Sequence, residues 1–242
     1  MSNGTIYGVG VGPGDPDLIS LKAYNIIKKA KCIAYFKKKE KNGIAYGIIK
    51  QYLKKNIFEI AMPYPITTEI SFLSLEYKKV LSNFYDDCCK RILSEINQNS
   101  DVIILCEGDP FFYGSFMHIH TRLYNKTKII VVPGITGMSA AWTATNLPIT
   151  WGDDILTVIM GTMEKKEIIK RIQNSDALVF MKIGKHFQKI RQILKELSLF
   201  DCAYLVENAS MLNEKVRKLK EVQETSLPYF SIIIIHGNGR RP

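Results

Sequence analysis

Three short loops combine glycine and proline with a few polar side chains, and these are the residues whose types and spacing could do chemistry. They are residues 12–15 (Gly-Pro-Gly-Asp), residues 107–114, which begin Glu-Gly-Asp-Pro, and residues 133–137 (Pro-Gly-Ile-Thr-Gly). Glycine lets the main chain approach a ligand closely, and proline stiffens a turn. Each loop alone is a turn by default. Together they are typical of a pocket lined by backbone, with few directional side chains.

Each of these loops follows a short apolar run that predicts a β-strand. The predicted strands of this part of the chain are residues 5–11, 32–36, 57–62, 102–106 and 129–132. Helical apolar patterns at residues 18–30 and 76–97 alternate with them, which favours a mostly parallel sheet. Because the carboxyl ends of parallel strands share one edge of a sheet, we expect the three loops to lie close together in space.

The alternation of predicted strands and helices changes after Thr150. The segment Trp151-Gly152-Asp153-Asp154 therefore predicts a boundary between two domains, residues 1–150 and 151–242. The second domain first alternates strands and helices and then closes with two β-like runs that we expect to be antiparallel, which gives a mixed sheet. Its predicted elements are strands 156–160, 177–181 and 202–206, helices 165–173 and 187–197, and the final runs 215–222 and 229–236. The predicted fold class is α/β in two domains, with a mostly parallel N-terminal sheet and a mixed C-terminal sheet.

Two familiar nucleotide-binding patterns fail at the first loop. A dinucleotide fingerprint needs a third glycine after two closely spaced ones, but Pro13, Asp15 and Asp17 stand at the three positions where it would fall. A P-loop needs Gly-Lys-Ser or Gly-Lys-Thr, and no such sequence follows these glycines. A dinucleotide-dependent oxidoreductase is therefore disfavoured.

Composition predicts an ordinary globular protein of the cytoplasm. The chain has 242 residues, of which 46% are hydrophobic, enough for packed cores, and it begins with no secretory signal pattern. Its longest aliphatic run, residues 232–235, is too short to span a bilayer. Five cysteines without a Cys-x-x-Cys pair fit reduced thiols, and His118 and His120 would point about 200° apart on a helix. We expect neither a disulfide nor a metal site.

The formal net charge of +10 has two interpretations. Lysines are spread through the whole chain, so much of the excess is a compositional background. The remainder would attract a polyanion, either a nucleic acid or a small substrate with several carboxylates. No recognisable nucleic-acid-binding motif accompanies the charge.

The glycine-rich motifs together resemble the tetrapyrrole methylase family. The resemblance is carried by Gly10-Val11-Gly12-Pro13-Gly14-Asp15-Pro16, Gly108-Asp109-Pro110 and Val132-Pro133-Gly134-Ile135-Thr136, and it extends over nearly the whole chain. It implies S-adenosylmethionine as the methyl donor, two α/β domains with the cofactor folded into the cleft between them, and a homodimer.

Longer strings resemble the family members that methylate carbon 20 of precorrin-2 in cobalamin biosynthesis, particularly the form that acts on the metal-free ring. They are residues 106–118, 137–139, 151–154, 181–182 and 227–231. The open alternatives are a methylase of the cobalt-bound ring and, more remotely, an RNA-directed methylase of the same fold.

The resemblance also implies which residues bind the cofactor. In the first domain these are Pro13, Gly14, Asp15, Gly108, Asp109, Phe112, Thr136 and Gly137. In the second domain they are Met181, Lys182, Val206 and Pro228.

Methyl transfer from a sulfonium is an in-line displacement, so the enzyme mainly has to position the nucleophile and exclude water. Attack by a ring carbon leaves a proton to be lost, and the candidate general bases are Glu107, Asp109, Tyr113 and His118. The carboxylates of a tetrapyrrole would suit a basic rim, for which the candidates are Lys37, Lys38, Lys39 and Lys185.

Overall fold

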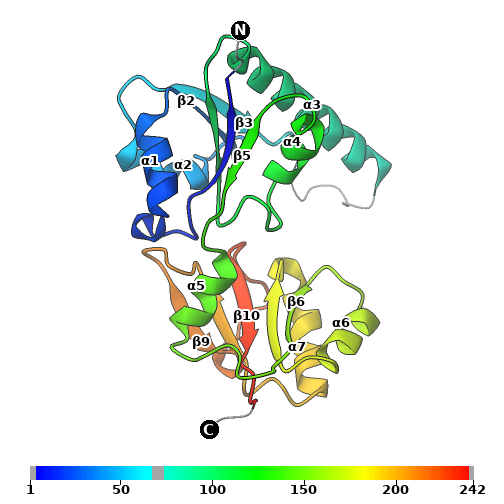
Figure 1. The fold of residues 1–242 in the computed structure, drawn as a ribbon. Helices are drawn as coiled ribbons and strands as arrows, with labels where there is room; N and C mark the ends of the chain where they lie inside the picture. Colours follow the sequence, from blue (N-terminus) through cyan, green and yellow to red (C-terminus); the bar gives the residue numbers. More distant parts are fainter. Residues whose placement is uncertain (1–3, 67–73, 240–242) are drawn as a thin grey trace. The chain divides into compact units, whose positions relative to one another are not determined.

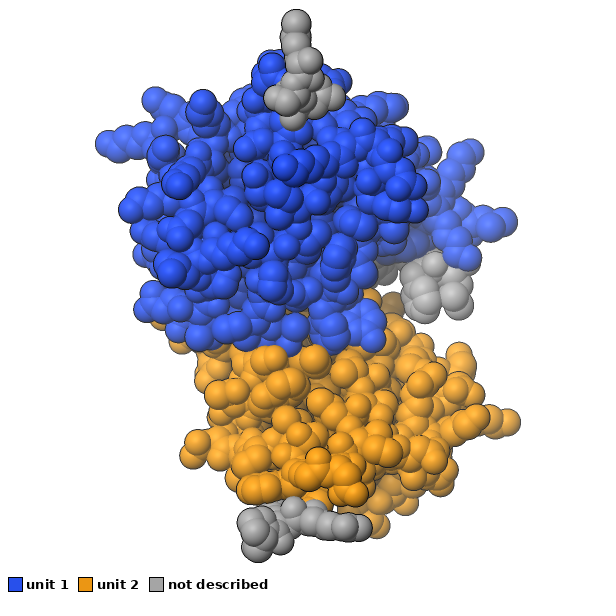
Figure 2. All heavy atoms as spheres, in the orientation of Figure 1, with its two compact units in different colours: residues 1–136 blue, residues 137–242 orange. Residues whose placement is uncertain are grey.

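The computed structural model describes residues 4–66 and 74–239. The chain forms two compact units, residues 1–136 and 137–242, which are blue and orange in Figure 2. Each unit is built around its own five-stranded sheet (Figure 1).

The sheet of unit 1 has the strand order β3-β2-β4-β1-β5, and all of these strands pair in parallel. The strands are β1 (Ile6–Gly10), β2 (Cys32–Lys37), β3 (Phe58–Pro63), β4 (Val102–Cys106) and β5 (Ile129–Val132). The predicted parallel sheet is therefore confirmed. The strands that precede the three loops, β4, β1 and β5, are direct neighbours in it.

Helices cover both faces of this sheet. Helices α1 (Leu21–Lys29) and α2 (Ile44–Ile49) pack on one face, and α3 (Leu75–Ile96) and α4 (Phe116–Leu123) pack on the other (Figure 1). Successive strand residues serve opposite faces, so that Ile103 packs with the first pair of helices and Ile104 with the second. Burial on both sides explains why the central strand β4 reads as a continuous apolar run.

The first helix begins later than its apolar pattern predicts. A short 3-10 turn (Pro16–Leu18) comes first, and Ser20 then accepts a hydrogen bond from the N–H of Ala23 at 3.2 Å, which caps α1. Leu18 and Ile19 continued the apolar pattern, but they lie before the cap. The long helix predicted over residues 76–97 is confirmed as α3, with Ser74 as its cap.

Unit 2 contains a mixed sheet of order β6-β7-β10-β8-β9, in which only β6 and β7 pair in parallel among the described strands. Its strands are β6 (Leu156–Met160), β7 (Ala177–Met181), β8 (Tyr204–Glu207), β9 (Lys215–Lys218) and β10 (Ser231–Ile235). Its helices are α5 (Gly137–Ala144), α6 (Lys165–Ile172) and α7 (Phe187–Glu196). The mixed sheet was predicted correctly.

The two last β-like runs differ from the prediction in detail. Strands β9 and β10 are not paired with each other, because β8 lies between them and pairs with both. Strand β9 also ends at Lys218, since the chain then enters a 3-10 turn (Leu219–Glu221) that turns Leu219 into the core.

The division between the units falls after Thr136, earlier than the joint expected at residues 150 and 151. The intervening segment packs on the second sheet: Ala141 of α5 contacts the core around Val206 and Ile234. The ring of His236 lies 2.9 Å from the carbonyl oxygen of Pro148, and it also lies 3.0 Å from the hydroxyl of Thr145. These contacts tie residues 137–150 to β10, which a change in sequence rhythm could not reveal.

Candidate functional site

The three glycine-rich loops meet at the carboxyl edge of the sheet in unit 1, as expected. The N–H of Val11 donates to the carbonyl oxygen of Cys106 at 2.9 Å, and the N–H of Gly108 donates to that of Gly12 at 2.8 Å. The third loop joins them, because the N–H of Gly134 donates to the carboxylate of Asp109 at 3.0 Å. Backbone bonds and one carboxylate thus hold the loops in a single group, which we call the glycine rim (residues 10–15, 107–114 and 133–136).

The glycines of this rim are required by close packing of backbone against backbone. A Cβ atom added to Gly134 would lie 2.1 Å from the carbonyl oxygen of Gly108, and one added to Gly10 would lie 2.6 Å from the nitrogen of Gly134. Gly12 and Gly108 also have positive φ angles of 83° and 64°, which L side chains adopt rarely. No larger residue would let the three loops approach in this way.

Asp109 has a structural task in this arrangement. One carboxylate oxygen accepts from the N–H of Phe111 at 2.8 Å, while the other accepts from Gly134 across the rim. Two backbone N–H groups from different loops are thus bonded to one carboxylate. The geometry therefore shows that Asp109 joins two loops, while its role as general base stays a prediction.

The turn after β1 is fixed in a similar manner. Asp15 accepts from the N–H of Asp17 at 2.8 Å and caps the following 3-10 turn, whereas Pro13 is buried and Gly14 is half-buried. The cap of Asp15 therefore fixes the end of this turn.

Glu107 is the candidate base whose proton affinity is best suited to catalysis near neutral pH. The residue is exposed at the surface, yet the surrounding protein desolvates its carboxylate and raises its pKa to about 7, against the opposing effect of a hydrogen bond from the N–H of Ala45. A base with a pKa near the working pH combines the ionised form with useful basicity. Because the residue is also exposed, solvent limits how far this shift contributes to stability.

Tyr113 lies in the same loop with a strained backbone. Its φ angle is 53°, and its ring meets that of Phe112 edge to face at 4.8 Å. A left-handed conformation at an aromatic residue is uncommon and costs free energy, so the surrounding loop holds it there. Phe111, Tyr113 and Ile135 are 48%, 48% and 42% exposed, so the glycine rim presents apolar surface to solvent.

His118 lies on α4 and packs against an aromatic ring. Its imidazole stacks on Tyr85 with centroids 4.4 Å apart. Burial, together with the positive charge of Arg122, lowers its pKa and favours the neutral ring. The structure therefore gives His118 a packing contact, and its role as a general base stays a prediction.

The predicted lysines are divided between the units. Lys37 ends β2, and Lys38 and Lys39 follow it at the same carboxyl edge as the glycine rim. Lys185 belongs to a 3-10 turn (Gly184–His186) of unit 2. Only the first three therefore share a sheet edge with the glycine rim.

The cofactor-binding residues predicted in unit 2 lie along one edge of its sheet. Met181 ends β7, and Lys182 follows with a φ angle of 53°. Val206 is buried near the end of β8, and Pro228 precedes β10. Because β10 is antiparallel to β7 and β8, its beginning lies beside their ends.

Of the other two predicted cofactor residues, Thr136 is half-buried at the end of unit 1, and Gly137 begins α5 in unit 2. A Cβ atom added to Gly137 would make only an ordinary contact, 3.9 Å from Ile232. This glycine is not required by the kind of close packing found at the rim.

Sequence reasoning missed a group of hydroxyls at the carboxyl edge of the sheet in unit 1. Tyr64 follows β3, Ser115 follows the 107–114 loop, and Tyr85 belongs to α3; hydrogen bonds link all three through Ser115. The position of Tyr64 directly after a parallel strand was the signal that could have identified it.

Residues 4–66 and 74–239 contain no group of three or more histidine, cysteine or carboxylate side chains that could hold a metal ion. The five cysteines, all of which lie in these ranges, are free thiols, and four of them are buried. No helix of the described chain is long and apolar enough to cross a membrane.

Comparison with known proteins gives consistent results. The family model of tetrapyrrole (corrin/porphyrin) methylases matches residues 5–223. A precorrin-2 C(20)-methyltransferase of Sinorhizobium sp is 38% identical over 239 residues, which cover 99% of this chain and 98% of that protein. A cobalt-precorrin-2 C(20)-methyltransferase of Salmonella typhimurium is 27% identical, with 97% of each chain covered.

Among solved structures, uroporphyrin-III C-methyl transferase from Thermus thermophilus, complexed with S-adenyl homocysteine, has the same fold. Its TM-score is 0.63 at 20% identity, and the match covers 96% of this chain and 92% of that one.

Proposed function

Because the chain belongs to the tetrapyrrole methylase family, we propose that the protein transfers a methyl group from S-adenosylmethionine to carbon 20 of precorrin-2, giving precorrin-3A in cobalamin biosynthesis. The observation that carries the proposal is the full-length similarity to a precorrin-2 C(20)-methyltransferase, at 38% identity. The glycine rim supports it, since these loops carry the motifs by which the chain resembles the family.

The rim fits a nucleoside methyl donor in two respects. Closely packed loops present main-chain groups, which bind ligands with fixed geometry. Phe111, Tyr113 and Ile135 add exposed apolar surface, which is unfavourable in water unless a ligand covers it. Both features suit a nucleoside.

When bound, S-adenosylmethionine supplies an electrophilic methyl group on a sulfonium. The task of the protein is then to hold the acceptor carbon in line with that group and to exclude water, because no covalent protein nucleophile is needed. Glu107 would accept the proton lost from carbon 20, because its pKa of about 7 makes it the best suited of the candidate carboxylates. Tyr113 stays a candidate for the same step, and Asp109 would keep the loops together.

The proposed cofactor contacts of unit 1 are Pro13, Gly14, Asp15, Gly108, Asp109, Phe112 and Thr136. Those of unit 2 are Gly137, Met181, Lys182, Val206 and Pro228. Each can be tested by the change in adenosylhomocysteine affinity that its substitution causes.

We further propose that the substrate is the metal-free ring, because the similarity to two enzymes of the cobalt-bound ring is lower, at 27% and 31% against 38%. The residues proposed to bind its carboxylates are Lys37, Lys38, Lys39 and Lys185. We also propose that the protein is a homodimer and that it is located in the cytoplasm. Free thiols support that compartment, and light scattering of the purified protein tests the dimer.

The decisive experiment incubates the purified protein with S-adenosylmethionine carrying a ¹³C-labelled methyl group and with either precorrin-2 or its cobalt complex. We expect NMR to locate one new methyl group on carbon 20, formed faster with the metal-free ring. A methyl group on another carbon would contradict the proposed position. Faster reaction of the cobalt complex would contradict the proposed metal preference. Calorimetry should show adenosylhomocysteine binding, and the absence of binding by folded protein would overturn the proposal as a whole.

A further inference from the structure

A network of three hydroxyls lies at the carboxyl edge of unit 1 and takes no part in the steps described above. The hydroxyls of Tyr64 and Ser115 are hydrogen-bonded, and Tyr85 donates to the Ser115 hydroxyl at 3.2 Å. Tyr64 directly follows β3, whereas Ser115 directly follows the 107–114 loop. The network therefore connects the outermost strand of the sheet with the end of a glycine-rim loop.

The ring of Tyr64 is fixed by its neighbours. It stacks on Phe36 with centroids 5.5 Å apart and planes inclined by 16°, and it lies 5.4 Å from the ring of Phe84. Its backbone N–H donates to the carbonyl oxygen of Lys37 at 2.9 Å. The half-buried side chain is thereby held beside the lysine run that begins at Lys37.

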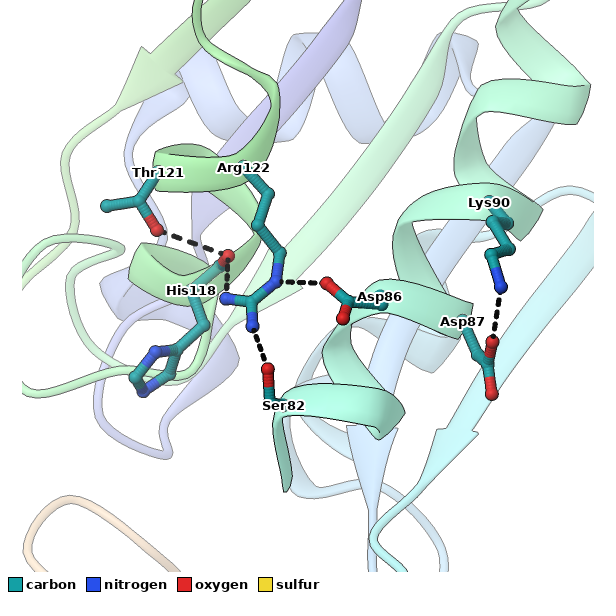
Figure 3. Close-up of polar contacts among 7 residues, drawn as sticks. All are labelled: Ser82, Asp86, Asp87, Lys90, His118, Thr121 and Arg122. Atoms are coloured by element: carbon teal, nitrogen blue, oxygen red, sulfur yellow. Dashed lines mark hydrogen bonds and ion pairs between the residues drawn. The ribbon is translucent and has the colours of Figure 1, made fainter. Parts of the chain in front are cut away.

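Tyr85 anchors the other end of the network. Its ring lies against the imidazole of His118 and has the guanidinium of Arg122 at 5.6 Å from its centroid. Arg122 is itself fixed, because it donates to Asp86 at 2.7 Å, to Ser82 at 3.1 Å and to the carbonyl oxygen of His118 at 3.1 Å (Figure 3). A buried ring held in this way gives Ser115, and through it Tyr64, one preferred geometry.

Packing alone does not explain these hydroxyls. The surrounding side chains include several aromatic rings, and phenylalanine would fill the positions of Tyr64 and Tyr85 without the cost of removing polar groups from water. Polar networks inside a protein fix geometry, and departures from simple packing rules are expected at functional sites. The hydroxyl of Tyr64 is therefore a candidate for ligand contact.

Its place in the strand order indicates which ligand. The glycine rim follows β4, β1 and β5, whereas Tyr64 and the lysines 37–39 follow β3 and β2 on the other half of the edge. At the usual spacing of strands, β3 lies about 14 Å from β1. Tyr64 thus adjoins the positive charges that suit a multiply carboxylated ring. It is remote from the turn after β1, which supplies Pro13, Gly14 and Asp15 to the proposed methyl-donor site.

Building on the proposed function, we infer that Tyr64 contacts the tetrapyrrole by donating a hydrogen bond to one of its carboxylates. In this arrangement Tyr85 donates to the Ser115 hydroxyl and Ser115 donates to the Tyr64 oxygen, so that both act as positioning residues that orient the Tyr64 hydroxyl. The macrocycle then occupies the β2–β3 half of the edge, and the 107–114 loop borders both ligands.

The test compares Tyr64→Phe with Tyr46→Phe. Tyr46→Phe is the matched control. It also removes a tyrosine hydroxyl from unit 1, and this hydroxyl donates to the exposed carboxylate of Glu59 at 3.1 Å. Three quantities are measured for each protein: the KM for precorrin-2, the KM for S-adenosylmethionine, and the affinity for uroporphyrin, a stable carboxylated tetrapyrrole whose binding is followed by its fluorescence. The affinity measurement needs no methyl transfer.

For Tyr64→Phe we expect the KM for precorrin-2 and the Kd for uroporphyrin to rise about tenfold, as loss of a hydrogen bond to a charged group implies. The KM for S-adenosylmethionine should stay within about twofold, and Tyr46→Phe should match the wild type in every measurement. Tyr85→Phe should weaken macrocycle binding in the same direction but by less. A purely structural role of Tyr64 would change both substrates together.

The outcomes separate the two proposals. If the wild type methylates precorrin-2 while Tyr64→Phe keeps wild-type affinity for the macrocycle, the contact with Tyr64 is refuted and the proposed function stands. If the wild type binds neither tetrapyrrole, the proposed function fails and the inference fails with it.

Discussion

Replacement of Gly134 by alanine tests the central feature of the glycine rim, the contact of backbone with backbone between three loops. The new Cβ atom would lie 2.1 Å from the carbonyl oxygen of Gly108 and 2.8 Å from the Cα atom of Gly10. Real Cβ atoms essentially never come closer than 3.0 Å, so the loops would have to separate by about 0.9 Å, the difference between 3.0 Å and 2.1 Å. Both obstacles are backbone atoms, which cannot rotate away.

The expected cost follows from two contributions. Overpacking of this kind costs about 1 to 3 kcal/mol. Separation of the loops would also break the 3.0 Å hydrogen bond from Gly134 to the carboxylate of Asp109, and a hydrogen bond to a charged group contributes about 1.5 to 3 kcal/mol. We therefore expect Gly134→Ala to lower the free energy of unfolding by about 2.5 to 6 kcal/mol and Tm by about 10 °C.

The assay is urea unfolding followed by circular dichroism, together with calorimetric titration of adenosylhomocysteine at a temperature where the variant is folded. The affinity should fall by about tenfold or more, because the displaced loops are those proposed to bind the cofactor.

Gly47→Ala is the matched control. Gly47 lies in α2, and an added Cβ atom would have no neighbour within 4 Å among the residues that the structure describes. Alanine is the better helix former, so this variant should be as stable as the wild type or more stable by about 0.5 to 1 kcal/mol, with unchanged affinity. If Gly134→Ala unfolds within about 1 kcal/mol of the wild type and binds adenosylhomocysteine equally well, the packing argument is refuted.

Three further predictions concern pH and helix capping. If Glu107 is the base, kcat/KM rises as pH increases through its pKa of about 7, because the ionised form is active. The variant Glu107→Gln should remove this rise. A pH profile of the variant that matches that of the wild type would exclude the role of Glu107 as the base. Burial lowers the pKa of His236 below its ordinary value, so the neutral ring stabilises unit 2 at pH above about 6.5 and this contribution is lost as pH falls toward the folded pKa. His236→Gln should therefore show a smaller loss of stability between pH 7.5 and pH 5.5 than the wild type in urea unfolding, and equal losses would refute the linkage. Ser20→Ala should lower the free energy of unfolding by about 1 kcal/mol because it removes the cap of α1. Ser20→Thr keeps the hydroxyl and should lower the free energy of unfolding only slightly. Equal unfolding midpoints for Ser20→Ala and the wild type would show that the cap does not contribute to stability.

The sequence by itself determined the two α/β sheets and the three loops at one sheet edge. Strand β4 and strand β7 begin and end where their apolar runs do, because a strand buried on both faces is continuously apolar and needs no distant information. The gathering of the loops followed from the same step, since parallel strands present their carboxyl ends at one edge. The motifs on these loops were also sufficient to identify the family.

Tertiary structure decided what depends on partners far apart in the chain. Residues 137–150 belong to the second unit because His236 and Ile234 contact them, and no local pattern carries that information. Asp109 proved to join two loops, because its second partner, Gly134, lies far along the sequence. The hydroxyl network of Tyr64, Ser115 and Tyr85 likewise draws on three separate elements, so only folding brings its members within hydrogen-bonding distance.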